Sequence, residues 1–380
     1  MFKTLFTILP FVFAGLLIPA FVLAGKIRTR GQAIWTMVFL FCASKFVCFE
    51  AIGGNAFAPE LPEKVIWFWN WAYSGMCVLL AFTFLALPVR FFVSRRYPFD
   101  RWRMGWVVAL PVLAWTVAAI GVYNGYKAPD VKEVSIEYEN LPEGLDGYRI
   151  VHISDIHASS ASRRWRTEKI VELANAAKPD LICVTGDLSD GYSAKRQKDL
   201  EPIRKLKAED GVYFSTGNHE YYFDFLNWRM TFAKWGLRIL DNRCVFPRAD
   251  LVIGGVNDLE CVRVRDLKPD PARVFEVATN GEFRILLQHR PAPDYAKIHG
   301  DGYKYGADLQ LSGHTHGGVM PGLNWLVSRA NKGFVKGLYR KEDGSALYVS
   351  PGSGQWAGFP VRLFNDSEIT VITLRRKSGR

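Results

Sequence analysis

The chain has 380 residues, 49% of them hydrophobic, and a formal net charge of +11. This length allows two domains. Residues 1–126 hold 11 Lys and Arg against 4 Asp and Glu, and the remainder holds 37 (48 − 11) against 33 (37 − 4). Most of the basic excess therefore lies between apolar segments, where it reports membrane topology, and we expect no nucleic-acid partner.

Four apolar runs occupy the first part of the chain, at about 5–24, 33–50, 65–89 and 104–123. Each is close to the ~20 residues that a helix needs to cross the hydrocarbon core of a bilayer. A buried core helix is the alternative for any single run. Four runs in succession, separated by charged loops, instead predict an all-α transmembrane domain of four helices over residues 1–126.

Basic residues mark the first and third of the loops between these runs. They are Lys26, Arg28 and Arg30 in the first loop and Arg90, Arg95, Arg96, Arg101 and Arg103 in the third. The second loop carries only Lys64. Because basic loops stay in the cytoplasm, the part after residue 126 is predicted outside. A competing reading is a cleaved leader ending in FVLAG (21–25), which would leave three helices.

Two charged residues, Lys45 and Glu50, fall near the outer end of the second run. A charge within the membrane usually marks a functional site. The alternative, which we slightly favour, is a lysine whose ammonium reaches the membrane interface. The sequence does not define the role of either residue, nor whether Cys244 and Cys261 form a disulfide.

The pattern changes after residue 126. Residues 127–148 are typical of a connector with an opening strand, and 149–380 of a globular domain. Its first three apolar strands lie in RIVHISDIH, DLICVTGD and GVYFSTGNHE, with helical patterns at about 164–178 and 195–207 between them. This β-α-β-α-β order predicts a mainly parallel sheet. Later strands are expected in LVIGGV, FRILLQH, ADLQLSGH, ALYVS and EITVITL.

Five of these predicted strands end in side chains that bind metals. In chain order they are Asp155, His157, Asp187, Asn218, His219, His289, His314 and His316. In open α/β sheets the site lies beyond the carboxyl ends of the strands. We therefore expect these residues to gather around one centre.

The donors in this set are all nitrogen or oxygen, which fits two divalent transition-metal ions such as Mn, Fe or Zn and excludes a cysteine-ligated site. Two ions about 3.5–4 Å apart would activate a shared water and hold both oxygens of an in-line displacement at phosphorus. Asp187 has two carboxylate oxygens and could bridge them.

The motif order DIH, GDL, GNHE, QHRP and SGHTHGG resembles the calcineurin-like metallophosphoesterase superfamily, and the end of the chain is similar to bacterial members of the YkuE/YaeI type. The resemblance covers roughly residues 146–375 and does not explain the apolar helices. It implies a four-layer α/β/β/α sandwich. It also implies a first metal on Asp155, His157 and His316, a second on Asn218, His289 and His314, and Asp187 as the bridge.

By the same resemblance, His219 would be catalytic, beside the substrate phosphate rather than on a metal. Arg290 and Tyr222 lie next to ligands in the sequence and are candidate substrate contacts. His152 is expected to be packed or hydrogen-bonded within a strand, and His299 to lie at the surface. PGSGQWAG (351–358) stands where the family usually has a Gly-Leu-Gly-like turn, which leaves the substrate contacts open.

The sequence thus predicts a membrane-anchored phosphoric ester hydrolase in a bacterial inner or cell membrane, with its catalytic domain extracytoplasmic. It would hydrolyse a phosphate ester by attack of a metal-bound water, on a cell-envelope or lipid-linked substrate. One alternative is a UDP-2,3-diacylglucosamine pyrophosphatase, although that substrate is made in the cytoplasm. Another is a metal-holding membrane sensor or binding module. The choice between monoester, diester and pyrophosphate, the metal and the oligomeric state stay open.

Overall fold

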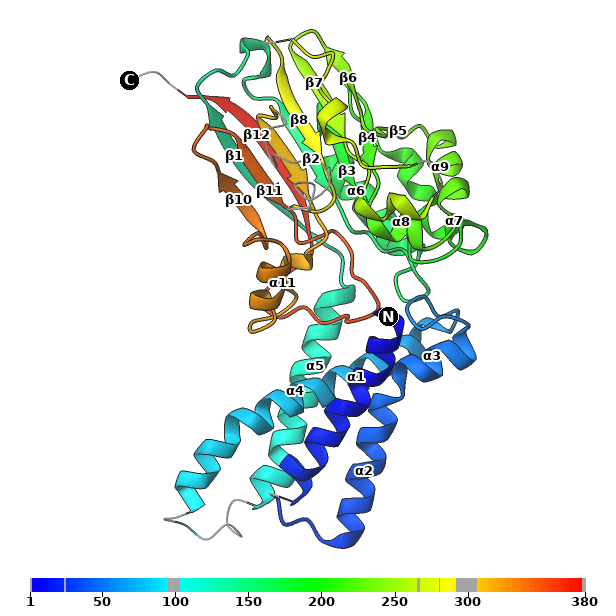
Figure 1. Cartoon of the computed structure of the whole chain (residues 1–380), viewed down its shortest axis with the longest axis vertical. Coiled ribbons are helices and arrows are strands. Elements are labelled where there is room, and N and C mark those ends of the chain that lie inside the picture. The colour runs from blue at the N-terminus through cyan, green and yellow to red at the C-terminus, as the bar shows by residue number, and fades with distance from the viewer. Residues whose placement is uncertain are drawn as a thin grey trace. The chain divides into compact units, whose positions relative to one another are not determined.

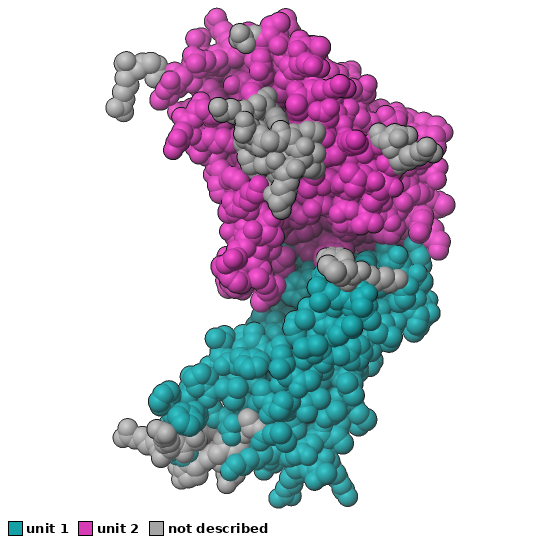
Figure 2. Space-filling view, viewed as in Figure 1, with its two compact units in different colours: residues 1–126, 357–362 teal, residues 127–356, 363–380 magenta. Residues whose placement is uncertain are grey.

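The computed structural model describes residues 2–23, 25–94, 97, 103–264, 267–279, 281–291 and 306–377. The chain forms two compact units (Figure 2). We call residues 1–126 with 357–362 the helical unit, and residues 127–356 with 363–380 the sandwich unit. A short segment of the C-terminal part thus belongs to the helical unit.

The helical unit contains the apolar helices. They are α1 (Phe2–Leu17) with its π-helical continuation Ile18–Leu23, α2 (Thr29–Ala43), α3 (Lys45–Gly53), α4 (Glu63–Ser94), the π-helical turn Gly105–Ala109 and α5 (Leu110–Tyr126). Among the described residues, three helices are long and apolar enough to cross a membrane, and there are four if α2 and α3 count as one span. The apolar helices expected from the sequence are therefore confirmed.

The second apolar run is not the single straight helix that was expected. It breaks at Ser44, and α2 and α3 are bent by 53°. The hydroxyl of Ser44 donates to the carbonyl of Phe41 at 2.8 Å. Such bonds from Ser to the preceding turn bend helices, and the apolar composition of the run gave no sign of one.

Helices α4 and α5 pack closely in the helical unit. The rings of Trp67 and Tyr126 stack at 5.3 Å, and Asn70 donates to the Tyr126 hydroxyl at 2.8 Å. Gly75 lies so close to Trp115 that an added Cβ would meet its indole nitrogen at 2.4 Å. A small residue here lets the two helices approach, as in other membrane helix pairs.

Lys45 is an internal anchor and does not reach outward, so the interpretation as a snorkelling lysine is wrong. Its side chain is fully buried, and its ammonium donates to the carbonyls of Ala357 and Gly358 at 3.1 and 2.9 Å. Phe46 and Tyr73 face the ammonium with their rings at 4.6 and 5.0 Å. Backbone carbonyls and aromatic faces thus replace the water that a buried ammonium loses.

The sandwich unit consists of two six-stranded sheets with helices (Figure 1). The first has the order β1 (Asp130–Tyr138), β12 (Glu368–Arg376), β2 (Arg149–Ile153), β3 (Leu181–Thr185), β4 (Val212–Ser215), β5 (Arg238–Ile239). The second has the order β10 (Gly337–Arg340), β11 (Ala346–Val349), β9 (Leu309–Ser312), β8 (Phe283–Leu287), β7 (Leu251–Gly255), β6 (Arg243–Arg248). Strands β2 to β5 are parallel, as are β7, β8, β9 and β11. The two mixed sheets confirm the sandwich fold.

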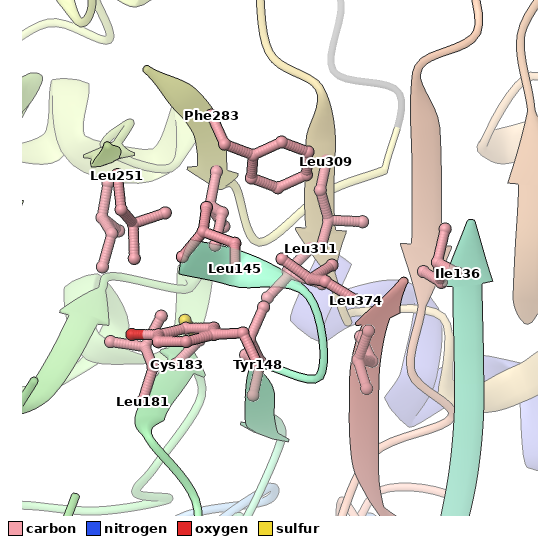
Figure 3. Packing of buried hydrophobic residues seen from close by; sticks show 14 of the residues in the cluster. Ile136, Leu145, Tyr148, Leu181, Cys183, Leu251, Phe283, Leu309, Leu311 and Leu374 are labelled. Carbon is pink, nitrogen blue, oxygen red and sulfur yellow. The ribbon is translucent and has the colours of Figure 1, made fainter. Parts of the chain in front are cut away.

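The main core lies between the two sheets. Leu181 and Cys183 of the first sheet pack in one cluster with Leu251, Phe283 and other residues of the second (Figure 3). On the other face of the first sheet, α6 (Arg164–Ala176) and α9 (Phe225–Lys234) contribute buried residues to a second cluster. Strands of the first sheet therefore bury both faces, which explains their unbroken apolar runs.

Candidate metal centre

The eight candidate ligands all follow strand ends in the sandwich unit. Asp155 and His157 come after β2, Asp187 after β3, and Asn218 and His219 begin α8 (Asn218–Tyr222) directly after β4. His289 follows β8, and His314 and His316 follow β9. Because β2, β3 and β4 run parallel, and β8 and β9 do too, the ligand-bearing loops leave each sheet at one edge.

The backbone is strained at five of these residues. Positive φ angles occur at Asp155 (53°), His157 (48°), Asp187 (55°), His314 (71°) and His316 (46°). This region is disfavoured for side chains other than glycine, and strain of this kind clusters at functional sites. The fold thus holds these side chains in orientations that an ordinary loop would not adopt.

The structure brings the side chains together in three overlapping groups. Each group has ligand atoms within 4.8 Å of one another: Asp155, His157 and His316; Asp187, His289 and His314; His157, Asp187 and His219. His157 Nε2 lies 3.1 Å from His316 Nε2, and His289 Nε2 lies 3.2 Å from His314 Nδ1. Asp187 groups with His289 and His314, and its Oδ2 also lies 3.7 Å from Nε2 of His157 in the first group, which is consistent with a bridging carboxylate. The geometry alone does not separate His219 from the metal ligands.

Several details fit bound metal ions. The Asn218 Oδ1 atom is buried and has no hydrogen-bond partner among the described residues. The Nδ1 atoms of His289 and His157 lie 2.6 Å from the Thr185 carbonyl and 2.9 Å from Asp190 Oδ1. A ring that donates from Nδ1 presents Nε2 as a ligand, which is the usual arrangement at metal-binding histidines. The nitrogen and oxygen donors of the His and Asp side chains are consistent with a dinuclear metal site.

Asp190 is a residue of this centre that the sequence reasoning missed. Its buried Oδ1 lies 2.9 Å from Nδ1 of His157 and 2.6 Å from Nδ1 of His219. Burial opposes the charge on this carboxyl, but the two histidines lower its pKa to about 2. One carboxylate therefore orients both rings. Its only sequence signal was its position three residues after Asp187.

His219 carries a strengthened positive charge. Burial favours its neutral form, but the carboxylates of Asp187 and Asp190 outweigh that effect and raise its pKa above the usual range. Two bound cations would offset part of the Asp187 charge. The Asp190 contact stays in place and keeps the proton of Nδ1 fixed, so that Nε2 is the atom available to a substrate.

Glu220 is a second residue that was missed. Its buried carboxylate accepts hydrogen bonds from the backbone amides of Asp187, Leu188 and Gly217 at 2.9, 2.7 and 2.7 Å. Burial, with a smaller contribution from Asp187, raises its pKa to about 7. Glu220 joins the loop after β3 to the loop after β4 and so fixes Asp187 relative to Asn218.

The two candidate substrate contacts lie at the rim of this centre. The guanidinium of Arg290 donates to both oxygens of Asp258, at 2.8 and 3.1 Å, so its charge is already paired. The ring of Tyr222 lies 5.2 Å from that of His219, and the side chain is 41% exposed. Tyr222 is therefore the better placed of the two to meet a substrate.

Within the described part of the chain, His152 and the cysteines take no part in the centre. His152 is buried in β2, its Nε2 lies 2.8 Å from the Thr185 hydroxyl, and burial lowers its pKa to about 3, so the expectation of a structural histidine is confirmed. His299 lies outside the described residues. Cys244 and Cys261 are both free thiols and form no disulfide.

Comparison with known proteins identifies the family. Residues 148–318 match the model of the calcineurin-like phosphoesterases. The chain is 31% identical to a metallophosphoesterase of Helicobacter pylori over 304 residues, which are 78% of this chain and 77% of that protein. The chain belongs to the calcineurin-like phosphoesterases. Its similarity to YkuE of Bacillus subtilis is 30% identity over 67% of this chain and 89% of that protein.

Relatives with membrane segments also occur in this calcineurin-like family. A transmembrane protein with a metallophosphoesterase domain from Danio rerio is 34% identical over 71% of this chain. The chain spans 62% of the length of that relative and 56% of a Caenorhabditis elegans metallophosphoesterase. Among solved structures, a 5'-nucleotidase from Staphylococcus aureus aligns with 55% of this chain and 49% of its own, at a TM-score of 0.36 and 11% identity.

Proposed function

We propose that this protein is a membrane-anchored, dinuclear-metal phosphoesterase that hydrolyses a phosphate ester of the cell envelope. One observation carries the proposal: the groups Asp155–His157–His316 and Asp187–His289–His314 lie side by side. Asn218, next to His219 in the chain, adds a buried oxygen without a hydrogen-bond partner among the described residues. Asp155, His157 and His316 would hold the first ion. The second ion would be held by Asn218, His289 and His314, and Asp187 would bind both ions.

The two ions, when bound, would supply an activated water and neutralise charge at phosphorus. The chain itself supplies the proton. His219 Nδ1 is held by Asp190 at 2.6 Å, which directs Nε2 to the substrate as a proton donor for the leaving oxygen. A positioned acid of this kind contributes about 10²–10⁴-fold to the rate. The carboxylates of Asp187 and Asp190 raise the pKa of His219 against the effect of burial and so favour the protonated ring.

The hydrogen-bonded pair of His219 and Asp190 supports an enzymatic function rather than that of a metal-holding sensor. A binding module needs the ligands but has no use for a proton donor beside them. Asp190 Oδ2 is also buried without a hydrogen-bond partner among the described residues, which is costly in a protein that gains nothing from it.

The sandwich unit is proposed to lie outside the cytoplasm. Eight basic residues fall in the first and third loops of the apolar region and one in the second. With four spans, this distribution supports an outer position for residue 127 and the sandwich unit. A cell-envelope substrate is consistent with that side.

Hydrolysis of bis(p-nitrophenyl) phosphate by the full-length protein in nanodiscs tests the proposal. Protein loaded with Mn, Fe or Zn should release p-nitrophenol, and an Asp187→Ala preparation should serve as the blank. A well-folded, fully metallated protein that hydrolyses neither this diester nor p-nitrophenyl phosphate would count against an enzyme and for a binding module.

A further inference from the structure

A solvent-exposed apolar and basic ridge lies beside the metal centre on the sandwich unit. Its apolar members are Trp325, Leu326 and Phe364, which are 59%, 52% and 91% exposed. Its basic members, also exposed, are Arg329, Lys332 and Lys336. We call these six residues the α11 ridge, after the helix α11 (Asn324–Ala330), of which no residue is buried.

Phe364 shows that the exposure is not incidental. Its backbone has a φ of 58°, a conformation that is unfavourable for a bulky side chain. At 91% exposure the ring gains little packing in return. Strain held at an exposed aromatic residue points to a role in contact with something else. The residue also follows closely on 357–362, the segment that belongs to the helical unit.

The positive charge of the ridge favours an anionic partner. Residues 309–341 contain no Asp or Glu, so Arg329, Lys332 and Lys336 belong to a stretch of sequence whose charged side chains are all basic apart from histidine. The guanidinium of Arg329 lies 5.5 Å from the centre of the Trp325 ring. Tryptophan together with basic residues is the composition of segments that bind at the membrane interface, where rings enter the head-group region and cations meet anionic lipids.

Hydrogen bonds connect the ridge to a metal ligand. Lys336 Nζ donates to Asn365 Oδ1 at 2.9 Å, and Asn365 Nδ2 donates to the carbonyl of His316 at 2.5 Å. The hydroxyl of Thr315 donates to the carbonyl of Val335 at 2.6 Å. A ligand that binds Lys336 on the ridge is therefore connected through Asn365 to the loop that carries His314 and His316.

We propose that the α11 ridge binds the surface of an anionic phospholipid bilayer and that the metal centre takes lipid-linked phosphoesters from that surface. The inference rests on the proposed phosphoesterase function and adds its substrate class. Apolar side chains in the head-group region and basic side chains bound to lipid phosphates would hold the metal centre close to the depth at which a lipid phosphoester lies.

Hydrogen exchange of the full-length protein tests the contact without reference to activity. Peptides covering 321–336 and 363–366 should exchange more slowly in phosphatidylglycerol nanodiscs than in phosphatidylcholine nanodiscs or dodecyl maltoside. The double variant Arg329→Glu, Lys332→Glu should lose this protection, because each basic residue strengthens binding to an anionic surface roughly fivefold. Protection that does not depend on lipid charge, or none in lipid, would overturn the inference.

Competition by a lipid phosphodiester tests the substrate class. Dihexadecyl phosphate in the nanodisc should raise the KM for bis(p-nitrophenyl) phosphate in the wild type. It should do so much less in the variant Trp325→Ser, Leu326→Ser, Phe364→Ser. Diethyl phosphate, which is water-soluble, should compete equally in both. Equal competition by the lipid in both proteins would overturn delivery through the ridge.

A matched control variant is Met230→Ser, Phe246→Ser, Val277→Ser, which removes three side chains that are 54%, 46% and 70% exposed elsewhere on the sandwich unit. It should behave as the wild type in both experiments. Hydrolysis of bis(p-nitrophenyl) phosphate in dodecyl maltoside, without added lipid, should be near the wild-type rate in every variant of the ridge. If the wild type itself does not hydrolyse this diester, the result counts against the phosphoesterase proposal instead.

Discussion

His219 Nδ1 and Asp190 Oδ1 lie 2.6 Å apart, and the same carboxylate oxygen lies 2.9 Å from Nδ1 of the candidate ligand His157. Asp190→Asn keeps an acceptor oxygen but removes the negative charge, so the hydrogen bonds to both rings become weaker. Residues that orient metal ligands typically cost about 10–100-fold in activity or metal affinity when changed. We expect a loss of that order in kcat.

A double variant separates positioning from a general loss of structure. If Asp190 acts partly through His219, Asp190→Asn combined with His219→Ala should cost much less than the product of the two single losses. Asp199→Asn is the control, since Asp199 is equally buried but pairs with Arg196 at 2.7 Å. Fully multiplicative effects would show that Asp190 does not act through His219.

The role of His219 itself can be measured against the leaving group. His219→Ala should lower activity by about 10²–10⁴-fold, the usual contribution of a general acid, while metal content stays near that of the wild type. Substrates with very acidic leaving groups should lose least, because they need no proton. Loss of metal would make His219 a ligand, and equal losses for all leaving groups would make it a charge stabiliser.

The metal ligands should fall into two classes. Asp187→Asn removes the charge of the residue shared by two groups and should disturb both ions, whereas His316→Ala should mainly affect the one held with Asp155 and His157. Elemental analysis of the purified protein should find close to two transition-metal ions per chain, and chelation should abolish activity. A folded protein that stays active after chelation would contradict a metal-dependent mechanism.

The residue pattern predicted the parallel strands because the central ones bury both faces and end in polar residues, whereas the sandwich itself was implied by the family resemblance. Strand β3 (Leu181–Thr185), for example, is entirely buried and precedes Asp187. Short elements were missed: β5 (Arg238–Ile239) has two residues and α8 (Asn218–Tyr222) has five, too few to show a period.

Residues that act across the fold were also beyond the sequence pattern. The Glu220 carboxylate accepts hydrogen bonds from backbone amides of the loop after β3, 32 and 33 residues away in the sequence. The Lys45 ammonium donates to carbonyls that are 312 and 313 residues away. No short sequence pattern around either residue indicates its distant partner. The ligands themselves could be predicted because each stands directly after its own strand, where the topology alone brings it to the site.

The anchoring role of Lys45 leads to a prediction for the helical unit. Lys45→Met removes both donors and leaves the carbonyls of Ala357 and Gly358 without them, at a cost of about 1–3 kcal/mol for each buried polar group. The segment 357–362 should then loosen, and the amide of Arg362, which donates to the Gly121 carbonyl at 2.9 Å, should exchange faster.

Hydrogen exchange in nanodiscs measures this effect, with the exposed Lys64→Met in the same unit as its control. Lys45→Arg keeps a donor group and should retain part of the protection. Unchanged exchange at 357–362 in Lys45→Met would show that other contacts hold the segment.

The orientation of the chain gives the last prediction. Since eight basic residues in two loops outweigh one in the other, a fusion of alkaline phosphatase at about residue 130 should be active and a green fluorescent protein there should be dark. The same reporters near residue 97 should behave oppositely. The break at Ser44 makes this experiment decisive, because α2 and α3 count as one span only if α3 completes the crossing that α2 begins. A fluorescent fusion at residue 130 would mean an odd number of spans or a cleaved leader. It would place the catalytic residues in the cytoplasm, where a nucleotide-linked lipid becomes the better substrate.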